Sequence, residues 1–148
     1  MHVMGIILHD TEGPLDAAVA WFQNAASGVS AHYLVGKDGR IIQMVLDKHH
    51  AYHAKGTLQM LPTWMTAMPK PPVMSRPNAY TVGIELELLA TDPDGAYTDV
   101  QYQRCDWLIE RLCQKYRIPR NRRRILGHGE IQTDRSDPRG LAWERLRL

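Results

Sequence analysis

The sequence predicts an α/β fold in which a single mixed β-sheet is flanked by helices, within one domain that spans residues 1–148. Three observations indicate this class. Segments with strand and helix patterns follow one another in the order strand, helix, hairpin, strand, long helix, strand. An Asp-Gly turn between two apolar runs is a strong hairpin signal. A chain of 148 residues with 44% hydrophobic residues can bury one core, and no linker or internal repeat divides it.

The first part of the chain contains a strand, a helix and a hairpin. Val3 to His9 is an apolar run with β-branched residues, which is typical of a buried strand. Apolar residues at helical spacing then predict a helix from Asp16 to about Asn24. Ser30 to Val35 and Arg40 to Val45 are predicted strands, and Lys37-Asp38-Gly39 forms the turn between them.

A long segment from Gly56 to Pro77 has little periodicity and is rich in proline and methionine around Trp64. One interpretation is a surface loop with a short helix around Pro62 to Met68. The other is a wall that faces a substrate, since loops of this length in compact domains are often binding loops. The sequence favours neither interpretation.

Tyr80 to Leu88 alternates apolar with polar residues, which predicts a strand with one polar face. Glu85 and Glu87 both lie on that face. A carboxylate on a central strand is costly to bury unless it has a purpose. The sequence leaves open which of the two carboxylates points toward a site, and pairing with an arginine is the structural alternative for Glu85.

The next predicted element is a long helix that stops at Pro119. Thr98 followed by Gln101 is a capping box at its start. Apolar residues then recur with a helical period, namely Cys105, Leu108, Ile109, Leu112, Cys113 and Tyr116. Ile125 to Gly127 is a last short strand, and it delivers His128.

The charge of the chain is mild. A net charge of +2 and a pI near 8.6 suit an anionic partner without demanding one. The basic run from Arg117 to Arg124 is a possible nucleic-acid patch. A solvated helix C-terminus explains it better, because cations there suit the helix dipole and no aromatic residues interleave for base stacking. We therefore expect no nucleic-acid partner.

Cys105 and Cys113 lie on the predicted helix, about 12 Å apart along its axis at 1.5 Å per residue. This separation is too large for a disulfide, so we expect reduced thiols. No signal-peptide pattern opens the chain, and no apolar run reaches transmembrane length. We expect a monomer without a membrane partner, either cytoplasmic or released and delivered by another system.

Three residues from separate parts of the chain form a candidate metal site. His9 ends the first predicted strand, His128 follows the last one, and Asp137 precedes a proline. Each alone has an ordinary structural explanation, as a strand-end histidine or a turn residue. Together they supply three ligands, and three protein ligands with one open position hold a catalytic zinc. Glu85 adds the base that a metal-bound water needs.

Seven segments in order match the pattern of one family. They are Ile7–Gly13, Trp21–Asn24, Val29–Val35 with the Asp38-Gly39 hairpin, Ala51–Ala54, Asn78 with Val82–Glu87, Gly127-His128 with Ser136–Pro138, and Ala142–Leu146. In these segments the chain resembles the type 2 N-acetylmuramoyl-L-alanine amidases, a zinc amidase fold shared with peptidoglycan recognition proteins and phage lysozyme-like amidases. The resemblance covers nearly the whole chain.

The resemblance implies that His9, His128 and Asp137 bind Zn²⁺ and that Glu85 is the general base. The implied reaction is hydrolysis of the amide bond between the lactyl group of N-acetylmuramic acid and L-alanine, in peptidoglycan or muropeptides. Arg135 stands where many relatives have a lysine that stabilises the oxyanion. Arginine is also a cation, but its donors form a rigid fork, so the geometry of that role changes.

The same resemblance makes His53 and Asn78 candidate substrate contacts. A structural histidine bonded to backbone explains His53 about as well. Ala31 stands where some relatives have a catalytic tyrosine, which places the weight of proton transfer on Glu85. We expect His32 to be structural.

The alternative function is a peptidoglycan-binding module of the same fold without catalysis. Binding-only relatives typically lose a metal ligand, whereas this chain keeps three candidate ligands and the candidate base. The partner in both cases is peptidoglycan or a muropeptide. The segment from Gly56 to Pro77 departs from the short glycine-rich or serine-rich link of many relatives, so the resemblance does not decide between the intact wall and anhydro-muropeptides.

Overall fold

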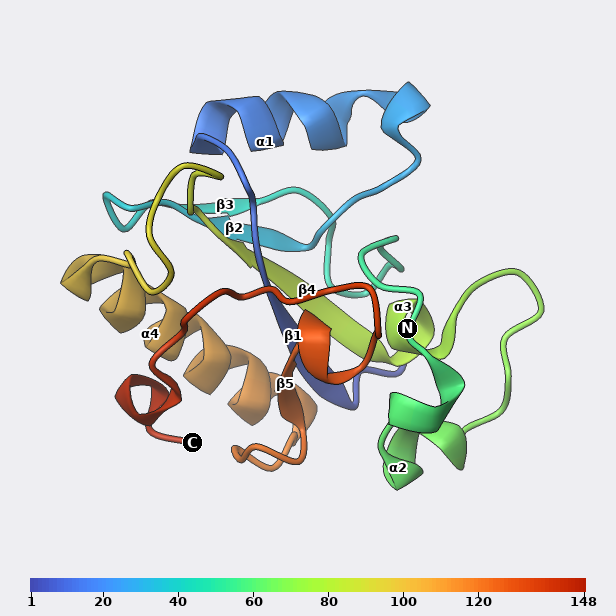
Figure 1. Ribbon diagram of the computed structural model, residues 1–148. Helices are drawn as coiled ribbons and strands as arrows, with labels where there is room; N and C mark the ends of the chain where they lie inside the picture. Colours follow the sequence, from blue (N-terminus) through green and yellow to red (C-terminus); the bar gives the residue numbers. More distant parts are fainter.

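The computed structural model describes all residues from Met1 to Leu148 and contains one five-stranded sheet (Figure 1). The order of the strands across the sheet is β3-β2-β4-β1-β5. β2 and β3 are antiparallel, whereas β2, β4, β1 and β5 are parallel. This arrangement confirms the predicted α/β class with a single mixed sheet. The strands are β1 (Gly5–Asp10), β2 (Tyr33–Val35), β3 (Ile41–Gln43), β4 (Thr81–Leu86) and β5 (Ile125–Gly127).

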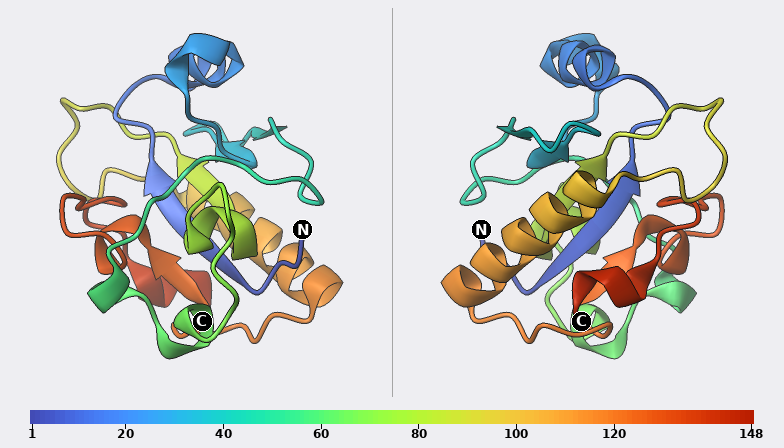
Figure 2. Two further views of the ribbon diagram at one scale, coloured as in Figure 1. Left: turned by 90° about the vertical axis from the view of Figure 1, so that its right-hand side faces the viewer. Right: turned by 90° about the vertical axis from the view of Figure 1, so that its left-hand side faces the viewer.

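Helices lie on both faces of the sheet, so the sheet forms the middle layer (Figure 2). They are α1 (Leu15–Gln23), α2 (Thr63–Thr66), α3 (Arg76–Tyr80) and α4 (Asp99–Tyr116). α4 crosses one face, and α3 lies on the opposite face. Short 3₁₀ turns occur at residues 25–27, 58–60, 128–130 and 143–146. None of the helices is long and apolar enough to cross a membrane.

The two faces of the central strands carry different residues. On the α4 face, Leu8 of β1 and Ile84 of β4 belong to the main core. On the opposite face, Ile7 packs into a small separate cluster. Successive side chains of a strand point to opposite faces, so His9 shares the face of Ile7, and Glu85 lies opposite to Ile84. His9 and Glu85 are therefore on the face away from α4.

α4 is fixed by its caps and by its apolar stripe. Thr98 and Gln101 form the predicted capping box, and Thr98 Oγ1 also donates to Lys37 O at 2.7 Å. The helix ends at Arg117, which adopts a left-handed conformation with φ 55°, two residues before Pro119. Both cysteines are free, as expected. The buried face of α4 includes the predicted apolar residues Cys105, Leu108, Ile109, Leu112 and Cys113.

The middle of the chain differs from the sequence prediction in one element. α2 lies within the short helix expected around Pro62 to Met68, but α3 occupies residues that the pattern assigns to a loop and to the start of a strand. Ser75 caps α3 because its Oγ accepts from Asn78 N at 3.3 Å. Pro77 lies in the first turn, where proline is favoured. These two residues are a valid helix-start signal, although the helix is too short to show periodicity.

Leu112 and Leu58 allow a matched test of the core. Leu112 is 2% exposed and Leu58 is 59% exposed. Leu112→Ala removes buried methyl groups and leaves a cavity, so we expect it to lower the free energy of unfolding by about 2–5 kcal/mol. Leu58→Ala should change it by less than about 0.5 kcal/mol. Urea unfolding measures both values, and equal losses would contradict the placement of the core beneath α4.

Candidate metal centre

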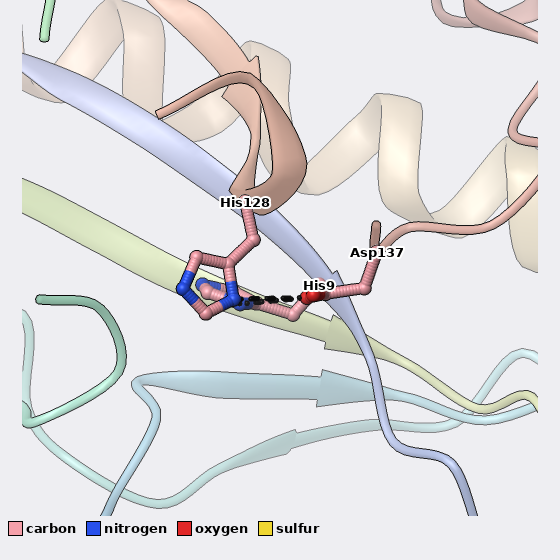
Figure 3. A group of neighbouring side chains, drawn as sticks. All are labelled: His9, His128 and Asp137. Carbon is pink, nitrogen blue, oxygen red and sulfur yellow. Dashed lines mark hydrogen bonds and ion pairs between the residues drawn. The ribbon is translucent and has the colours of Figure 1, made fainter. Parts of the chain in front are cut away.

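His9, His128 and Asp137 converge at one edge of the sheet (Figure 3). His9 Nδ1 lies 3.1 Å from His128 Nδ1, and Asp137 Oδ2 lies 3.1 Å from each of these two nitrogens. The two histidines are buried, and the aspartate is partly buried. The structure thus brings together the three residues that the sequence analysis selected as metal ligands.

The register of the sheet explains why two of these residues meet. His9 is the penultimate residue of β1 and pairs with Glu85 of β4. Leu8 pairs with Gly127, the last residue of β5, so His128 follows directly after that strand. Because the three strands are parallel, their carboxyl ends lie at the same edge of the sheet, where α/β proteins commonly bind ligands.

The loop that carries Asp137 folds back on the turn after β5. Gly129 N donates to Asp137 O at 2.9 Å. A Cβ on Gly129 would lie 3.0 Å from both Arg135 O and Ser136 Cα, so this close approach of two backbone segments requires glycine. These contacts hold the aspartate beside His128.

The donor set and its spacing fit a metal ion of the zinc type. Two imidazole nitrogens and a carboxylate oxygen are ligand types of catalytic zinc sites, which keep a fourth position open. With bonds of roughly 2.0–2.1 Å in a tetrahedral site, neighbouring donors lie about 3.3 Å apart. The donors here are separated by 3.1 Å. A cleft of about 250 Å³ opens beside them and gives access to the site.

Glu85 lines the same cleft as the three candidate ligands. Burial raises the pKa of Glu85 well above its usual value, and the neighbouring carboxylate of Asp137 raises it further. Glu87 is engaged elsewhere, because its two carboxylate oxygens accept from Leu15 N at 3.0 Å and from Lys37 N at 2.8 Å. The structure therefore distinguishes the two carboxylates that the sequence could not.

The protonation of the cluster suits metal binding. Burial lowers the pKa of His9, which favours the neutral imidazole. A neutral imidazole and an ionised carboxylate are the forms that bind a metal.

The outer ring nitrogens of both histidines are hydrogen-bonded. His9 Nε2 lies 3.0 Å from His53 Nδ1, and His128 Nε2 lies 3.0 Å from Gln132 Oε1. Gln132 is not among the site residues predicted from the sequence. Its spacing of one helical turn from His128 is the only local signal, and that signal is weak.

The other site residues predicted from the sequence border the cleft or a hollow that adjoins it. Asn78 borders an adjoining hollow of about 280 Å³, but its Oδ1 accepts from His53 N at 2.9 Å and from Ala54 N at 2.8 Å. Arg135 is exposed and borders both the cleft and the hollow. Lys55 adds a second cation to the hollow.

The basic run after α4 is engaged in local contacts. Arg120 forms ion pairs with Asp106 and Glu110 of α4. Arg122 pairs with Glu130 at 2.6 Å. The guanidinium group of Arg124 lies over the ring of Trp64, 4.5 Å from its centroid. These contacts give the run a structural role that needs no nucleic acid.

Comparison with known proteins identifies the family. The chain belongs to the N-acetylmuramoyl-L-alanine amidase family (Amidase_2), whose profile matches residues 1–140. Over 88 residues it is 39% identical to N-acetylmuramoyl-L-alanine amidase A of Achromobacter lyticus. The aligned residues make up 59% of this chain and 38% of that protein. Over 122 residues it is 36% identical to the 1,6-anhydro-N-acetylmuramyl-L-alanine amidase AmpD of Escherichia coli K12. The aligned residues make up 81% of this chain and 57% of AmpD.

A solved relative has the same fold. The structure of Escherichia coli AmiD in complex with the substrate anhydro-N-acetylmuramic acid-L-Ala-D-γ-Glu-L-Lys matches with a TM-score of 0.73 and 22% identity. The match covers 99% of this chain and 57% of AmiD. The chain thus spans only 38% and 57% of the lengths of the two curated relatives.

His32 is fully buried and has a structural role, because both of its ring nitrogens bond to the backbone. Gly83 N donates to His32 Nδ1 at 3.0 Å, and His32 Nε2 donates to His49 O at 3.1 Å. Burial lowers the pKa of His32 from 6.5 to about 4. An unfolded chain therefore takes up a proton below pH 6.5 that the folded chain does not accept until about pH 4.

Stability should therefore fall as the pH drops through this window, because protons favour the unfolded state there. A shift of this size corresponds to about 3 kcal/mol for His32. Urea unfolding of the metal-free protein at pH 7.5 and pH 4.5 measures the loss, and His32→Asn should lose less than the wild type. His49→Asn, at an exposed residue, is the control. Parallel losses in His32→Asn and wild type would contradict this assignment.

Proposed function

We propose that this domain is a zinc-dependent amidase that cleaves the amide bond between the lactyl group of N-acetylmuramic acid and L-alanine. Its substrate class is peptidoglycan or the muropeptides derived from it. The observation that carries the proposal is the set of three converging donors that opens on one cleft with Glu85. Membership of the amidase family supports it.

The alternative is a binding module of the same fold without catalysis. Binding of a muramyl peptide needs a cleft, but it does not need metal donors and a buried carboxylate in that cleft. The burial of His9 and Glu85 costs free energy, and binding alone gives no reason for that cost. The enzyme is therefore the favoured function.

The residues of the cleft have distinct chemical roles in this proposal. His9, His128 and Asp137 would hold the zinc ion, which would supply a Lewis acid to polarise the scissile carbonyl and activate water. Glu85 accepts a proton from the attacking water and returns it to the leaving amine. Arg135 donates N–H groups toward the carbonyl oxygen as negative charge develops there.

The walls of the cleft fit an acidic muramyl peptide. Trp21, Phe22 and Tyr52 form an apolar wall beside the candidate ligands. Lys55 and Arg135 place positive charge in the adjoining hollow, and such cations attract the carboxylates of a stem peptide. The peptide bound to Escherichia coli AmiD contains a glutamate of this kind.

Metal analysis and a muropeptide digest test the proposal together. We expect about one zinc per chain, release of stem peptide from muropeptides, and loss of that release on chelation. Glu85→Gln keeps the side-chain shape but removes the base, so it should retain zinc and lower kcat by about 10²–10⁴-fold. Glu144→Gln, at an exposed residue, is the matched control.

Three outcomes would contradict the proposal in different ways. A metal-free protein that still cleaves muropeptides would exclude the zinc mechanism. A zinc protein that binds muropeptides and never releases stem peptide would establish the binding module. A full rate in Glu85→Gln would place the base elsewhere.

Arg135 can be tested by shortening and by replacement. Removal of one donor that stabilises an oxyanion lowers kcat by about 10²–10³-fold, so we expect Arg135→Ala to lose this much while it retains zinc. Arg135→Lys keeps a cation and should recover part of the rate. Arg123→Ala changes an exposed arginine and should have no effect. Equal rates in Arg135→Ala and wild type would show that Arg135 has no role in the reaction.

A further inference from the structure

We propose that one short segment, residues 53–56, orients both histidine ligands of the metal centre. Its His53 side chain accepts a hydrogen bond from His9. Its backbone at Lys55 and Gly56 fixes Gln132, which accepts a hydrogen bond from His128. This inference rests on the proposed zinc site and assigns a positioning role to His53 and Gln132.

Two backbone amides define the side-chain oxygen of Gln132. Lys55 N and Gly56 N both donate to Gln132 Oε1 at 3.0 Å. This atom is therefore an acceptor, and the other end of the amide, Gln132 Nε2, donates to Asp134 Oδ1 at 2.7 Å. His128 Nε2 lies 3.0 Å from the same Oε1, so that nitrogen must carry a hydrogen. The neutral ring then has a lone pair on His128 Nδ1.

The neighbours of His53 define its tautomer, which in turn defines the tautomer of His9. His53 Nε2 lies 3.3 Å from Thr81 O, which can only accept. Thr81 Oγ1 lies at the same distance, and its own hydrogen is donated to Pro77 O at 2.7 Å. His53 Nε2 therefore carries the hydrogen, and His53 Nδ1 is an acceptor. His9 Nε2, 3.0 Å away, must donate to it, which leaves a lone pair on His9 Nδ1.

Both chains of hydrogen bonds end at the candidate metal position. Two nitrogen lone pairs and the Asp137 carboxylate oxygen lie 3.1 Å from one another, and none of them carries a hydrogen to share. Three such acceptors repel one another unless a cation lies between them. The hydrogen bonds made by residues 53–56 thus prepare the donors for a metal before it binds, as outer partners of metal ligands commonly do.

The segment is itself held rigidly. Asn78 Oδ1 accepts from both His53 N and Ala54 N, and Ser75 Oγ donates to Ala54 O. The ring of His53 packs on Gly83 of β4, where an added Cβ would lie 2.5 Å from His53 Cγ. Glycine at this position is therefore a requirement of the support. Both ring nitrogens of His53 are occupied, which leaves only carbon atoms for a substrate.

Pairs of variants with the same shape test the role of the acceptors. His53→Asn keeps an oxygen near the position of Nδ1, whereas His53→Leu has a similar shape without an acceptor. Gln132→Glu, made together with Asp134→Asn so that the second oxygen still meets a donor, and Gln132→Met form the same kind of pair. We expect the Leu and Met variants to lose about 10–100-fold in zinc affinity, and the Asn and Glu variants to recover most of it. Competition with a chromophoric chelator measures the affinity, and Leu112→Ala, in the core beneath α4, controls for a general loss of packing.

Gly83→Ala offers an independent test that removes no polar group. The added methyl group displaces the His53 ring, so zinc affinity should fall about as far as in His53→Leu. Gly13→Ala is the control, because a Cβ there meets only Thr11 O at 3.9 Å. Circular dichroism of each metal-free variant shows whether it is folded.

A measurement on the zinc-loaded wild type needs no variant at all. Long-range ¹H–¹⁵N spectra should show a hydrogen on Nε2 of His9, His53 and His128, and none on Nδ1. A hydrogen on His53 Nδ1, or equal zinc affinities in His53→Asn and His53→Leu, would overturn this inference while the zinc amidase stands. Absence of zinc from the wild-type protein would overturn the proposed function and this inference with it.

Discussion

The parallel pairing of β1 with β4 and β5 is the constraint on which the rest of the structure depends. Backbone hydrogen bonds set His9 opposite Glu85 and Leu8 opposite Gly127, and strand alternation then decides which side chains share a face. A slip of one residue would turn His9 into the apolar core beneath α4 and move a leucine into the cleft. The main core of 19 buried residues therefore protects the register of the site as well as the stability of the domain.

The same edge of the sheet concentrates negative charge, and the protein compensates each carboxylate in a different way. Asp10 Oδ2 accepts from Arg139 N at 2.9 Å and from Arg139 Nε at 3.3 Å. Asp137 lies beside the Nδ1 atoms of the two histidines, where a bound cation would balance its charge, whereas burial works against the ionised form of Glu85. A bound dication would favour the ionised forms of Asp137 and Glu85. Metal binding and the protonation of Glu85 are therefore coupled, because the charge at Asp137 and at the metal position acts on the Glu85 carboxylate.

Local patterns in the sequence predict the fold well because its main elements are long or strongly apolar. The period of α4 identifies the long helix, and the apolar runs of β1 and β5 identify the strands that bring His9 and His128 to the site. The choice between Glu85 and Glu87 depends instead on backbone amides of distant segments, which no local pattern reveals. Gln132 is missed for the same reason, since its role depends on amides 76 and 77 residues away in the chain.

The long segment after Gly56 is tied to the domain at both ends and in its middle, where Met65 is fully buried. Thr57 N donates to Ile131 O at 2.7 Å where the segment begins, and Ser75 bonds to Ala54 O where it ends. Between these points, Trp64 Nε1 donates to Arg123 O at 2.8 Å. Val73 and Met74 of this segment border the hollow beside the cleft. Substitutions at these two residues therefore change the wall of the hollow without removing a hydrogen bond that positions either histidine.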